Sequence, residues 1–216
     1  MAGHRRTNRE IEVKLRIADV DEALRNLRNI GAKSESRVLE RNTLFDTLES
    51  ALRRSGRLLR IRIETIAPRN PKGRLDPPRS NTVTRAVLTA KAPAPSKSAA
   101  APRYKEKFER ELVVRNPSRW QQVFADLGLR PNFRYEKFRT TLRIPRLDLV
   151  LDLDETPAGV FLELEGAPRA IDQTARALGF SPSVYYRGTY WDVYAADCRR
   201  RGRTPRNMLF RSRKSR

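Results

Sequence analysis

A strict alternation of charged and aliphatic side chains near the start of the chain constrains its fold more than any other feature. The segment reads Glu10-Ile11-Glu12-Val13-Lys14-Leu15-Arg16-Ile17. Because successive side chains of a β-strand point to opposite faces, it is predicted to be a strand with one apolar face and one face carrying both signs of charge. Taken alone, it leaves open an ordinary strand whose polar face meets water.

A similar alternation returns in three later segments, which are 59–63, 149–154 and 161–165. Arginines occupy the charged positions of the first segment, and carboxylates occupy those of the other two. If such strands close into a barrel, their aliphatic faces pack under helices while their charged faces line a common lumen. A lumen of this kind suits a polyanion chelated to a divalent metal, since basic groups hold phosphate oxygens and carboxylates hold the metal.

A series of motifs resembles, in order, those of the CYTH superfamily, also called triphosphate tunnel metalloenzymes. The opening Glu10-x-Glu12-x-Lys14 is similar to the family signature, and the later motifs are Asn42–Thr47, Leu59–Arg62, Leu88–Lys91, Glu109–Glu111, Lys137–Arg139, Leu151–Glu155 and Phe161–Glu165. One such motif is weak evidence, whereas the ordered set over residues 9–195 is specific. The resemblance implies an α+β fold, with a closed antiparallel β-barrel of about eight strands forming a polar tunnel inside surrounding helices.

Length and composition agree with one catalytic domain. A chain of 216 residues can bury one sizeable core. The single Cys198 excludes an internal disulfide and fits a reducing compartment. The basic start leads into a charged strand rather than an apolar run, and no stretch approaches the roughly 20 apolar residues of a membrane-spanning helix. The sequence therefore predicts a cytoplasmic protein.

The formal net charge of +21 is extreme, and much of it lies at the end of the chain. From Arg199 onward the basic residues have no acidic residue among them. We predict a basic extension over 1–8, the CYTH-like tunnel domain over 9–195, and a basic, disordered tail over 196–216. Such a tail can contact nucleic acid or an anionic surface weakly, or simply keep the chain solvated.

Helices and strands can be placed coarsely. Asp19 is expected to cap a helix that ends at Gly31, Pro117 to begin a second helix that ends at Gly128, and 170–178 to form a third. Further strands are predicted over 36–46, 58–65, 83–91, 105–115, 135–144, 147–154 and 159–165. Loose Pro-rich connections are expected over 67–81 and 92–102, and 183–191 is expected to form a short helix that closes one end of the barrel.

Carboxylates at two-residue spacing are the candidate metal ligands. Glu10 and Glu12 project to one side of their strand, and Glu163 and Glu165 do the same on a later strand. Asp152 and Asp154 are further candidates, and one of Glu109 and Glu111 is expected to complete or support the site. The alternative is a set of surface carboxylates. Ligation by oxygen atoms alone predicts Mg²⁺ or Mn²⁺, and the absence of a Cys/His cluster argues against structural zinc.

Basic residues on the same strands are the candidate phosphate clamps. They are Arg60, Arg62, Lys91 and Arg139, with Lys14 and Lys137 beside them. Arginine offers paired planar donors to phosphate, while lysine acts as a movable point charge. The alternative is that these groups only neutralise lumen carboxylates. By resemblance, Lys14 acts with Glu12 and Glu163 in catalysis, and Arg187 replaces a late basic residue of some family members.

The resemblance implies metal-assisted attack on a triphosphate such as tripolyphosphate, ATP or thiamine triphosphate. Attack by water makes the protein a triphosphatase, which is the favoured reading because it needs only the tunnel features. Attack by a ribose hydroxyl makes it a class IV adenylyl cyclase that releases cyclic AMP and pyrophosphate. A non-catalytic polyphosphate- or nucleotide-binding module is the third alternative, and a homodimer is compatible with the sequence.

Overall fold

The computed structural model describes residues 9–67, 85–94 and 103–211. Among these residues the strands are β1 (Arg9–Ile17), β2 (Lys33–Asp46), β3 (Leu58–Ile66), β4 (Arg85–Pro93), β5 (Lys105–Val113), β6 (Arg130–Arg143), β7 (Leu149–Thr156) and β8 (Gly159–Gly166). The helices are α1 (Val20–Asn29), α2 (Ala51–Arg54), α3 (Pro117–Asp126), α4 (Pro168–Ala177), the 3₁₀ turn η1 (Pro182–Val184) and α5 (Tyr190–Arg200).

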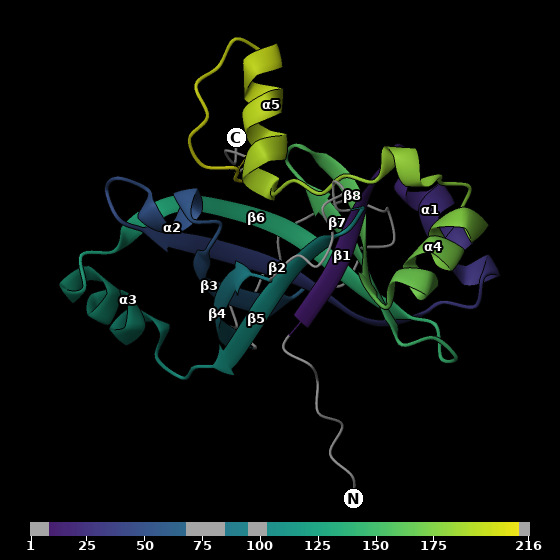
Figure 1. Ribbon diagram of the computed structural model, residues 1–216, viewed down its shortest axis with the longest axis horizontal. Coiled ribbons are helices and arrows are strands. Elements are labelled where there is room, and N and C mark those ends of the chain that lie inside the picture. Colours follow the sequence, from purple (N-terminus) through teal and green to yellow (C-terminus); the bar gives the residue numbers. More distant parts are fainter. Residues whose placement is uncertain (1–8, 68–84, 95–102, 212–216) are drawn as a thin grey trace, which may run out of the picture.

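The strands form one closed antiparallel barrel in the order β1-β5-β4-β3-β2-β6-β7-β8 (Figure 1). Closure occurs at β1, which pairs with β5 on one side and β8 on the other. This register sets Glu12 opposite Lys105 and Lys14 opposite Glu163. The predicted α+β barrel is confirmed, and its closure makes neighbours of charged residues far apart in the sequence.

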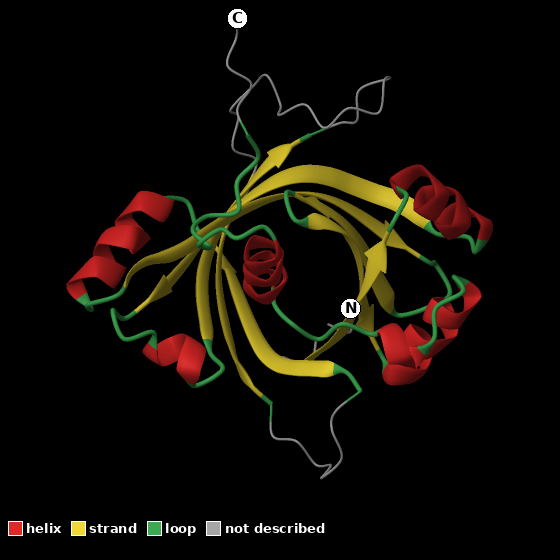
Figure 2. Ribbon diagram, turned by 90° about the horizontal axis from the view of Figure 1, so that it is seen from above, coloured by secondary structure: helices red, strands yellow, loops and turns green. Residues whose placement is uncertain are grey.

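The aliphatic faces of β1, β7 and β8 form the main core beneath α1 and α4. Leu15, Leu151 and Leu164 are fully buried there, together with Leu27 of α1 and Ile171 of α4. Viewed from above, both helices lie outside the barrel wall (Figure 2). Because the apolar side chains of these strands pack against the helices outside the barrel, the charged residues that alternate with them face the lumen.

Local signals at the first two predicted helices are confirmed. The Asp19 side chain accepts hydrogen bonds from the backbone N–H groups of residues 21 and 22, so it caps α1, and Gly31 follows with φ +85°. Pro117 begins α3, and Gly128 lies just after its end with φ +77°. In α3 only Phe124 is buried, with its ring centroid 5.0 Å from that of Phe45.

Two strands are longer than the sequence indicated. β2 begins at Lys33 rather than at 36, and β6 begins at Arg130 rather than at 135. These strands pair with each other from Lys33–Arg143 to Asp46–Arg130, with two register shifts, so each extends the other beyond its recognisable alternation. The one-turn helix α2 was not foreseen.

The final predicted helix is wrong in position. Residues 183–191 were expected to be helical, but after η1 the chain is extended and Tyr186 forms backbone hydrogen bonds with Lys14 in both directions. The helix starts later because the capping residue is Thr189, whose side chain accepts from the Asp192 N–H in a capping box. The resulting α5 stands over one end of the barrel (Figures 1 and 2).

The expectation of a disordered tail from 196 is also wrong for the residues that the structure describes. Residues 196–200 belong to α5, and 201–211 return to the barrel, where Met208 is 1% exposed. The reason is a long-range pairing of Met208 with Tyr135, which composition alone does not reveal. The predicted extension at 1–8, most of the two Pro-rich connections and the final five residues lie outside the described residues.

Candidate active site in the barrel lumen

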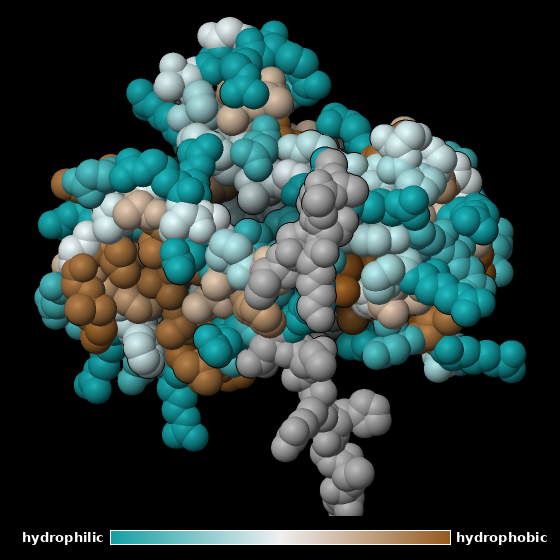
Figure 3. Space-filling model, viewed as in Figure 1, coloured by the Kyte–Doolittle hydropathy of each residue, from teal (hydrophilic) through white to brown (hydrophobic). Residues whose placement is uncertain are grey.

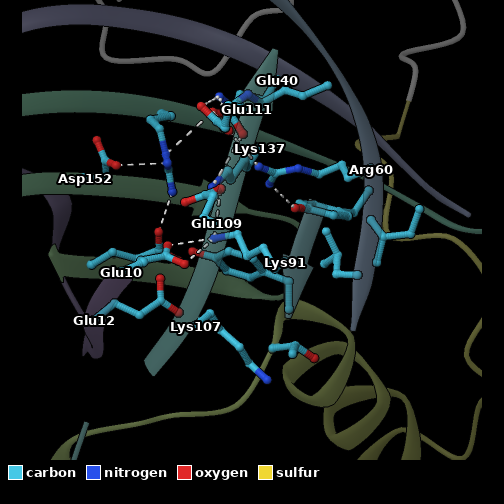
Figure 4. A pocket seen from close by; sticks show the side chains of 18 of the residues that line it. Glu10, Glu12, Glu40, Arg60, Lys91, Lys107, Glu109, Glu111, Lys137 and Asp152 are labelled. Atoms are coloured by element: carbon cyan, nitrogen blue, oxygen red, sulfur yellow. Dashed lines mark hydrogen bonds and ion pairs between the residues drawn. The ribbon is translucent and has the colours of Figure 1, made fainter. Parts of the chain in front are cut away.

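The inward faces of the strands enclose a cavity of about 630 Å³. Its wall includes the predicted residues Glu10, Glu12, Lys14, Arg60, Arg62, Lys91, Glu109, Glu111, Lys137, Arg139, Asp152, Glu163 and Glu165. Figure 4 shows several of them projecting into the cavity from different strands. The two-residue spacing on each strand therefore brings both signs of charge into one lumen.

At one place in the lumen wall, Lys91 lies between carboxylates of two strands. Its Nζ atom lies 2.6 Å from both carboxylate oxygens of Glu10 and 3.2 Å from Glu109 Oε1 (Figure 4). Burial acts to lower the pKa of Lys91, but the negative charge of Glu10 outweighs it and the pKa is raised. Lys91 is thus a fixed cation between carboxylates from β1 and β5.

Lys14 lies between two predicted catalytic carboxylates. Its Nζ atom lies 2.8 Å from Glu12 Oε1 and 3.0 Å from Glu163 Oε1, and Lys105 Nζ lies 2.5 Å from Glu12. Burial opposes charge here too, yet the carboxylates raise the pKa of Lys14, and the ammonium groups lower the pKa of Glu12. In the metal-free protein Lys14 is therefore held protonated, which suits it to positioning Glu12 and Glu163.

Glu165 differs from the other lumen acids because no described residue forms a hydrogen bond or ion pair with it. Burial, followed by the negative charge of Glu10, raises the pKa of Glu165 to about 8. Glu109 and Glu12 act in the same direction. Burial is the largest cause of this shift, and the three neighbouring carboxylates add negative potential that Lys91 offsets only in part.

That excess negative potential fits a divalent cation. Glu10, Glu12, Glu109 and Glu165 supply carboxylate oxygens, which are the ligands that Mg²⁺ and Mn²⁺ prefer. Within the described part of the chain, no three acidic, histidine or cysteine side chains already converge on one point. Binding would therefore require Glu10, Glu12 and Glu109 to turn at least one carboxylate oxygen from their lysine partners toward an ion shared with Glu165.

Replacing Glu165 by glutamine is expected to change how stability depends on pH in metal-free protein. Between the ordinary pKa of 4.5 and about 8, folded Glu165 keeps a proton that the unfolded chain loses. Stability due to this group therefore falls as pH rises through that window. Glu165→Gln should match wild type below pH 4.5 and exceed it by about 1–3 kcal/mol near pH 8, once solvent screening is allowed for.

Urea denaturation in the presence of a chelator, across this pH range, measures the effect. The Glu106→Gln variant, which changes an acid in an exposed pair with Arg9, serves as the control and should keep the wild-type slope. Superimposable pH profiles for wild type and Glu165→Gln would contradict the raised pKa.

The part of the lumen wall formed by β6, β7 and β8 is held together by Arg139 and Lys137. Arg139 contacts Asp152 at 2.9 Å, Asp154 at 2.6 Å and Glu163 at 2.5 Å, and Lys137 Nζ lies 2.8 Å from Asp154 Oδ2. Asp154 is fully buried and does not line the cavity; it lies behind the two cations. Its role is therefore to position the cations rather than to bind a ligand at the cavity surface.

Arg60 has mainly neutral partners and is therefore the cation best able to accept a phosphate. Its guanidinium donates to the Tyr135 hydroxyl and to Thr89 Oγ1, both at 3.2 Å, and its ion-pair partner Glu111 lies farther away, with Oε1 at 3.6 Å. Arg62, in contrast, lies 2.9 Å from Glu64 and 3.2 Å from Glu111.

Several lumen residues escaped the sequence reasoning. They are Glu40, Lys105, Lys107, Tyr135 and Tyr190. Glu40 is 1% exposed and contacts Lys137 at 3.5 Å and Arg139 at 3.7 Å. A two-residue spacing could have revealed Glu40, Lys105 and Lys107. Glu40 has this spacing with Asn42 on β2, and the two lysines have it with Glu109 on β5. Nothing local marks the two tyrosines.

The position of Arg187 does not agree with its predicted role. Arg187 is exposed in the segment between η1 and α5 and is not part of the cavity wall. The cause is the extended conformation of this segment, which is paired with β1 through Tyr186. A basic residue that does line the lumen beside α5 is Arg53, whose guanidinium lies 4.8 Å from the Trp191 ring centroid.

Aromatic side chains gather where α5 meets the barrel. Phe133, Tyr135, Tyr190 and Trp191 all line the cavity, and the Phe133 and Trp191 ring centroids are 4.9 Å apart. Tyr190 also donates a 2.6 Å hydrogen bond to Asp154. The lumen thus has a charged middle and an aromatic end.

The fold and the cavity together define a class of protein, a closed antiparallel barrel whose interior is lined by both cations and carboxylates. The sequence matches the CYTH domain over residues 8–179. The chain therefore belongs to the CYTH domain family, whose members are enzymes acting on triphosphates. No curated protein sequence matches this chain significantly.

Solved structures agree with this fold. The PH1012 protein from Pyrococcus horikoshii is similar with a TM-score of 0.65 and 22% identity, covering 85% of this chain and 98% of that one. A proposed adenylate cyclase from Vibrio parahaemolyticus has a TM-score of 0.62 and 16% identity, covering 85% and 96%. HpAC1 from Hippeastrum, a proposed adenylyl cyclase described as having a dominant triphosphatase activity, has a TM-score of 0.54 and 18% identity, covering 91% and 97%. At these identities the likeness shows the fold alone.

None of the described helices is both long enough and apolar enough to cross a membrane.

Proposed function

We propose that this protein is a divalent-metal-dependent triphosphatase that hydrolyses an inorganic or organic triphosphate inside the barrel. The observation that carries the proposal is the shared cavity, in which Arg60, Lys137 and Arg139 are held together with Glu10, Glu12 and Glu165. A cavity built only to bind an anion would gain nothing from so many carboxylates. A cavity built only to bind a cation would gain nothing from the arginines.

The cations and the carboxylates of the lumen have distinct roles in this proposal. Arg60 and Lys137 bind phosphate oxygens and neutralise charge that develops on the leaving oxygen. Lys14 positions Glu12 and Glu163, which it contacts at 2.8 and 3.0 Å. The cation-binding carboxylates are Glu10, Glu12, Glu109 and Glu165, and a bound Mg²⁺ or Mn²⁺ supplies further charge neutralisation and alignment.

Hydrolysis then needs little covalent chemistry from the protein. Water attacks the terminal phosphorus in line, the bond from that phosphorus to the bridging oxygen breaks, and orthophosphate and a diphosphate leave. Most of the acceleration comes from aligning the phosphates of the substrate between the cations and the carboxylates of the lumen, since the transition state differs from the ground state mainly in charge distribution.

A class IV adenylyl cyclase activity is the second candidate, and the aromatic end of the lumen favours it. Phe133, Tyr135 and Trp191 offer ring faces and edges next to Arg60, whose guanidinium is bonded to the Tyr135 hydroxyl. A purine ring placed there would leave its triphosphate among the cations. In that case the ribose hydroxyl attacks the α-phosphorus and pyrophosphate leaves.

Product analysis distinguishes the two reactions. Purified protein is incubated with tripolyphosphate, ATP or thiamine triphosphate and Mg²⁺ or Mn²⁺, and products are resolved by phosphorus NMR and chromatography. Orthophosphate release supports hydrolysis, while cyclic AMP with pyrophosphate supports cyclisation. Glu12→Gln and Glu163→Gln variants should lose about 10²–10³-fold in activity while keeping the barrel fold by circular dichroism. Metal-dependent binding without turnover would rule out both reactions and leave a binding module.

A further inference from the structure

The segment after α5 forms a folded extension on the outside of β6. Met208 N donates to Arg134 O at 2.9 Å, Glu136 N donates to Met208 O at 2.9 Å, and Arg134 N donates to the Asn207 side chain at 2.9 Å. Figure 1 shows the chain leaving the far end of α5 and returning to the barrel. Residues 201–211 are therefore held at a fixed place, beyond the end of the CYTH match at residue 179.

This extension presents arginines with little neutralising charge. Six exposed arginines lie between 197 and 211, namely Arg199, Arg200, Arg201, Arg203, Arg206 and Arg211. The acid in this stretch is Asp197, which contacts Arg200 at 2.8 Å and Arg201 at 2.9 Å. The other four have no carboxylate partner among the described residues. Hydrophilic residues predominate on the visible side of α5 and the following loop in Figure 3, with some less polar residues between them.

The arginines also surround a hollow rather than only standing on a convex surface. Arg201, Arg203 and Arg211 line a cavity of about 450 Å³ whose wall includes Met208 and Phe210. We define the arginine surface as these three residues together with Arg199, Arg200 and Arg206. Asp197 also lines this hollow, where it pairs with Arg201. Arg203 and Arg211 are the guanidinium groups of the hollow that no carboxylate of the described residues engages, and their planar donors suit phosphate groups.

The partner is recognised through phosphate rather than through bases. The aromatic rings beside the hollow are already packed: the Phe210 centroid lies 5.1 Å from that of Phe138, and the Tyr194 centroid lies 6.1 Å from that of Phe133. Neither ring is presented as a stacking platform of the kind used for single-stranded nucleic acids. The surface thus offers charge and paired donors without a means of reading bases.

We propose that the arginine surface binds inorganic polyphosphate, a linear chain of linked phosphates, at a site separate from the tunnel. The helix that carries the surface begins at the tunnel cavity, since Tyr190, Trp191 and Asp192 line that cavity. The choice of polyphosphate over other polyanions rests on the proposed triphosphate chemistry of the tunnel. Binding to the surface does not depend on turnover.

The test measures binding of fluorescently labelled long-chain polyphosphate by anisotropy to the full-length protein, with saturating tripolyphosphate to occupy the tunnel. The surface variant is Arg203→Gln/Arg206→Gln/Arg211→Gln. The matched control is Arg25→Gln/Arg28→Gln/Arg176→Gln, which removes the same charge from exposed positions on α1 and α4, on the other side of the molecule (Figure 1).

The surface variant should bind at least about tenfold more weakly and reduce the slope of log affinity against log salt by about 2, since three phosphate contacts are lost. The control should stay within about twofold of wild type. Equal weakening in both variants would show a response to net charge alone and overturn the proposal. So would unchanged binding in the surface variant, or tighter binding of single-stranded RNA with the same number of phosphates.

Two further measurements keep the result interpretable. Thermal unfolding should show the same midpoint for the three proteins, because the substituted arginines are exposed. If the triple surface variant is unfolded, single Arg203→Gln and Arg211→Gln variants replace it, each expected to weaken binding by about two- to fivefold; no weakening in either would overturn the proposal. Activity on tripolyphosphate, measured separately, reports on the tunnel, so failure of one proposal is distinguishable from failure of the other.

Discussion

Replacing Asp154 by alanine is expected to lower the free energy of unfolding by about 3–5 kcal/mol. Asp154 is fully buried and accepts hydrogen bonds from Lys137, Arg139 and Tyr190 at 2.6–2.8 Å. Removing its carboxylate takes from Lys137 its closest counter-charge and from Arg139 one of three close ones, and the contacts of both cations with Glu40 are 3.5 Å or longer. Urea denaturation of wild type and variant at neutral pH measures the loss.

Tyr190→Phe is the matched comparison, because it deletes one hydrogen bond to the same carboxylate and keeps the ring. It should lower the free energy of unfolding by only about 1 kcal/mol. If Asp154→Ala proves no more destabilising than Tyr190→Phe, the buried carboxylate is not what stabilises the cations of this wall.

The second large effect is on activity: Arg60→Met is expected to reduce kcat/KM for triphosphate hydrolysis by about 10²–10³-fold. Arg60 is buried in the lumen wall, and its hydrogen bonds go to the hydroxyl groups of Tyr135 and Thr89 rather than to a carboxylate. Its charge is therefore available to a phosphate. Methionine keeps much of the side-chain volume and removes the donors. Steady-state kinetics with tripolyphosphate measures the effect.

Arg41→Met provides the control, since Arg41 lies on the same barrel and pairs at 3.4 Å with Glu136, with its side chain 37% exposed. It should retain wild-type kinetics. Arg60→Lys should recover only part of the activity, because lysine restores the charge without the planar pair of donors. Wild-type kcat/KM in Arg60→Met would remove Arg60 from the phosphate clamp.

Much of the barrel and of its lumen was predictable because strand geometry is local. A period of two assigns Glu10, Glu12 and Lys14 to one face of β1 whatever the rest of the chain does. The same rule places Arg60 with Arg62 on β3, and Glu163 with Glu165 on β8. The ordered motifs then indicated that these faces share a lumen, as the cavity lining confirms for these residues.

Charge partners were beyond local reasoning, because they depend on which strands pair and in what register. Lys14 lies between Glu12 and Glu163 because β1 meets β8 with Lys14 opposite Glu163. Glu165 is opposite Glu12 on the same pair of strands yet has no cationic partner among the described residues. The pKa of Glu12 is therefore lowered while that of Glu165 is raised, although both acids belong to pairs with the same two-residue spacing. Only the tertiary arrangement distinguishes them.

The end of the chain shows the same division. The sequence by itself determined that this region is strongly basic, and composition of that kind is typical of disorder. Whether it folds depended on contacts with residues some seventy positions earlier, where Met208 pairs with Tyr135 and Phe210 N donates to Glu136. Periodicity reports which face of an element a side chain occupies, whereas burial and charge pairing are set by segments that the chain brings together only on folding.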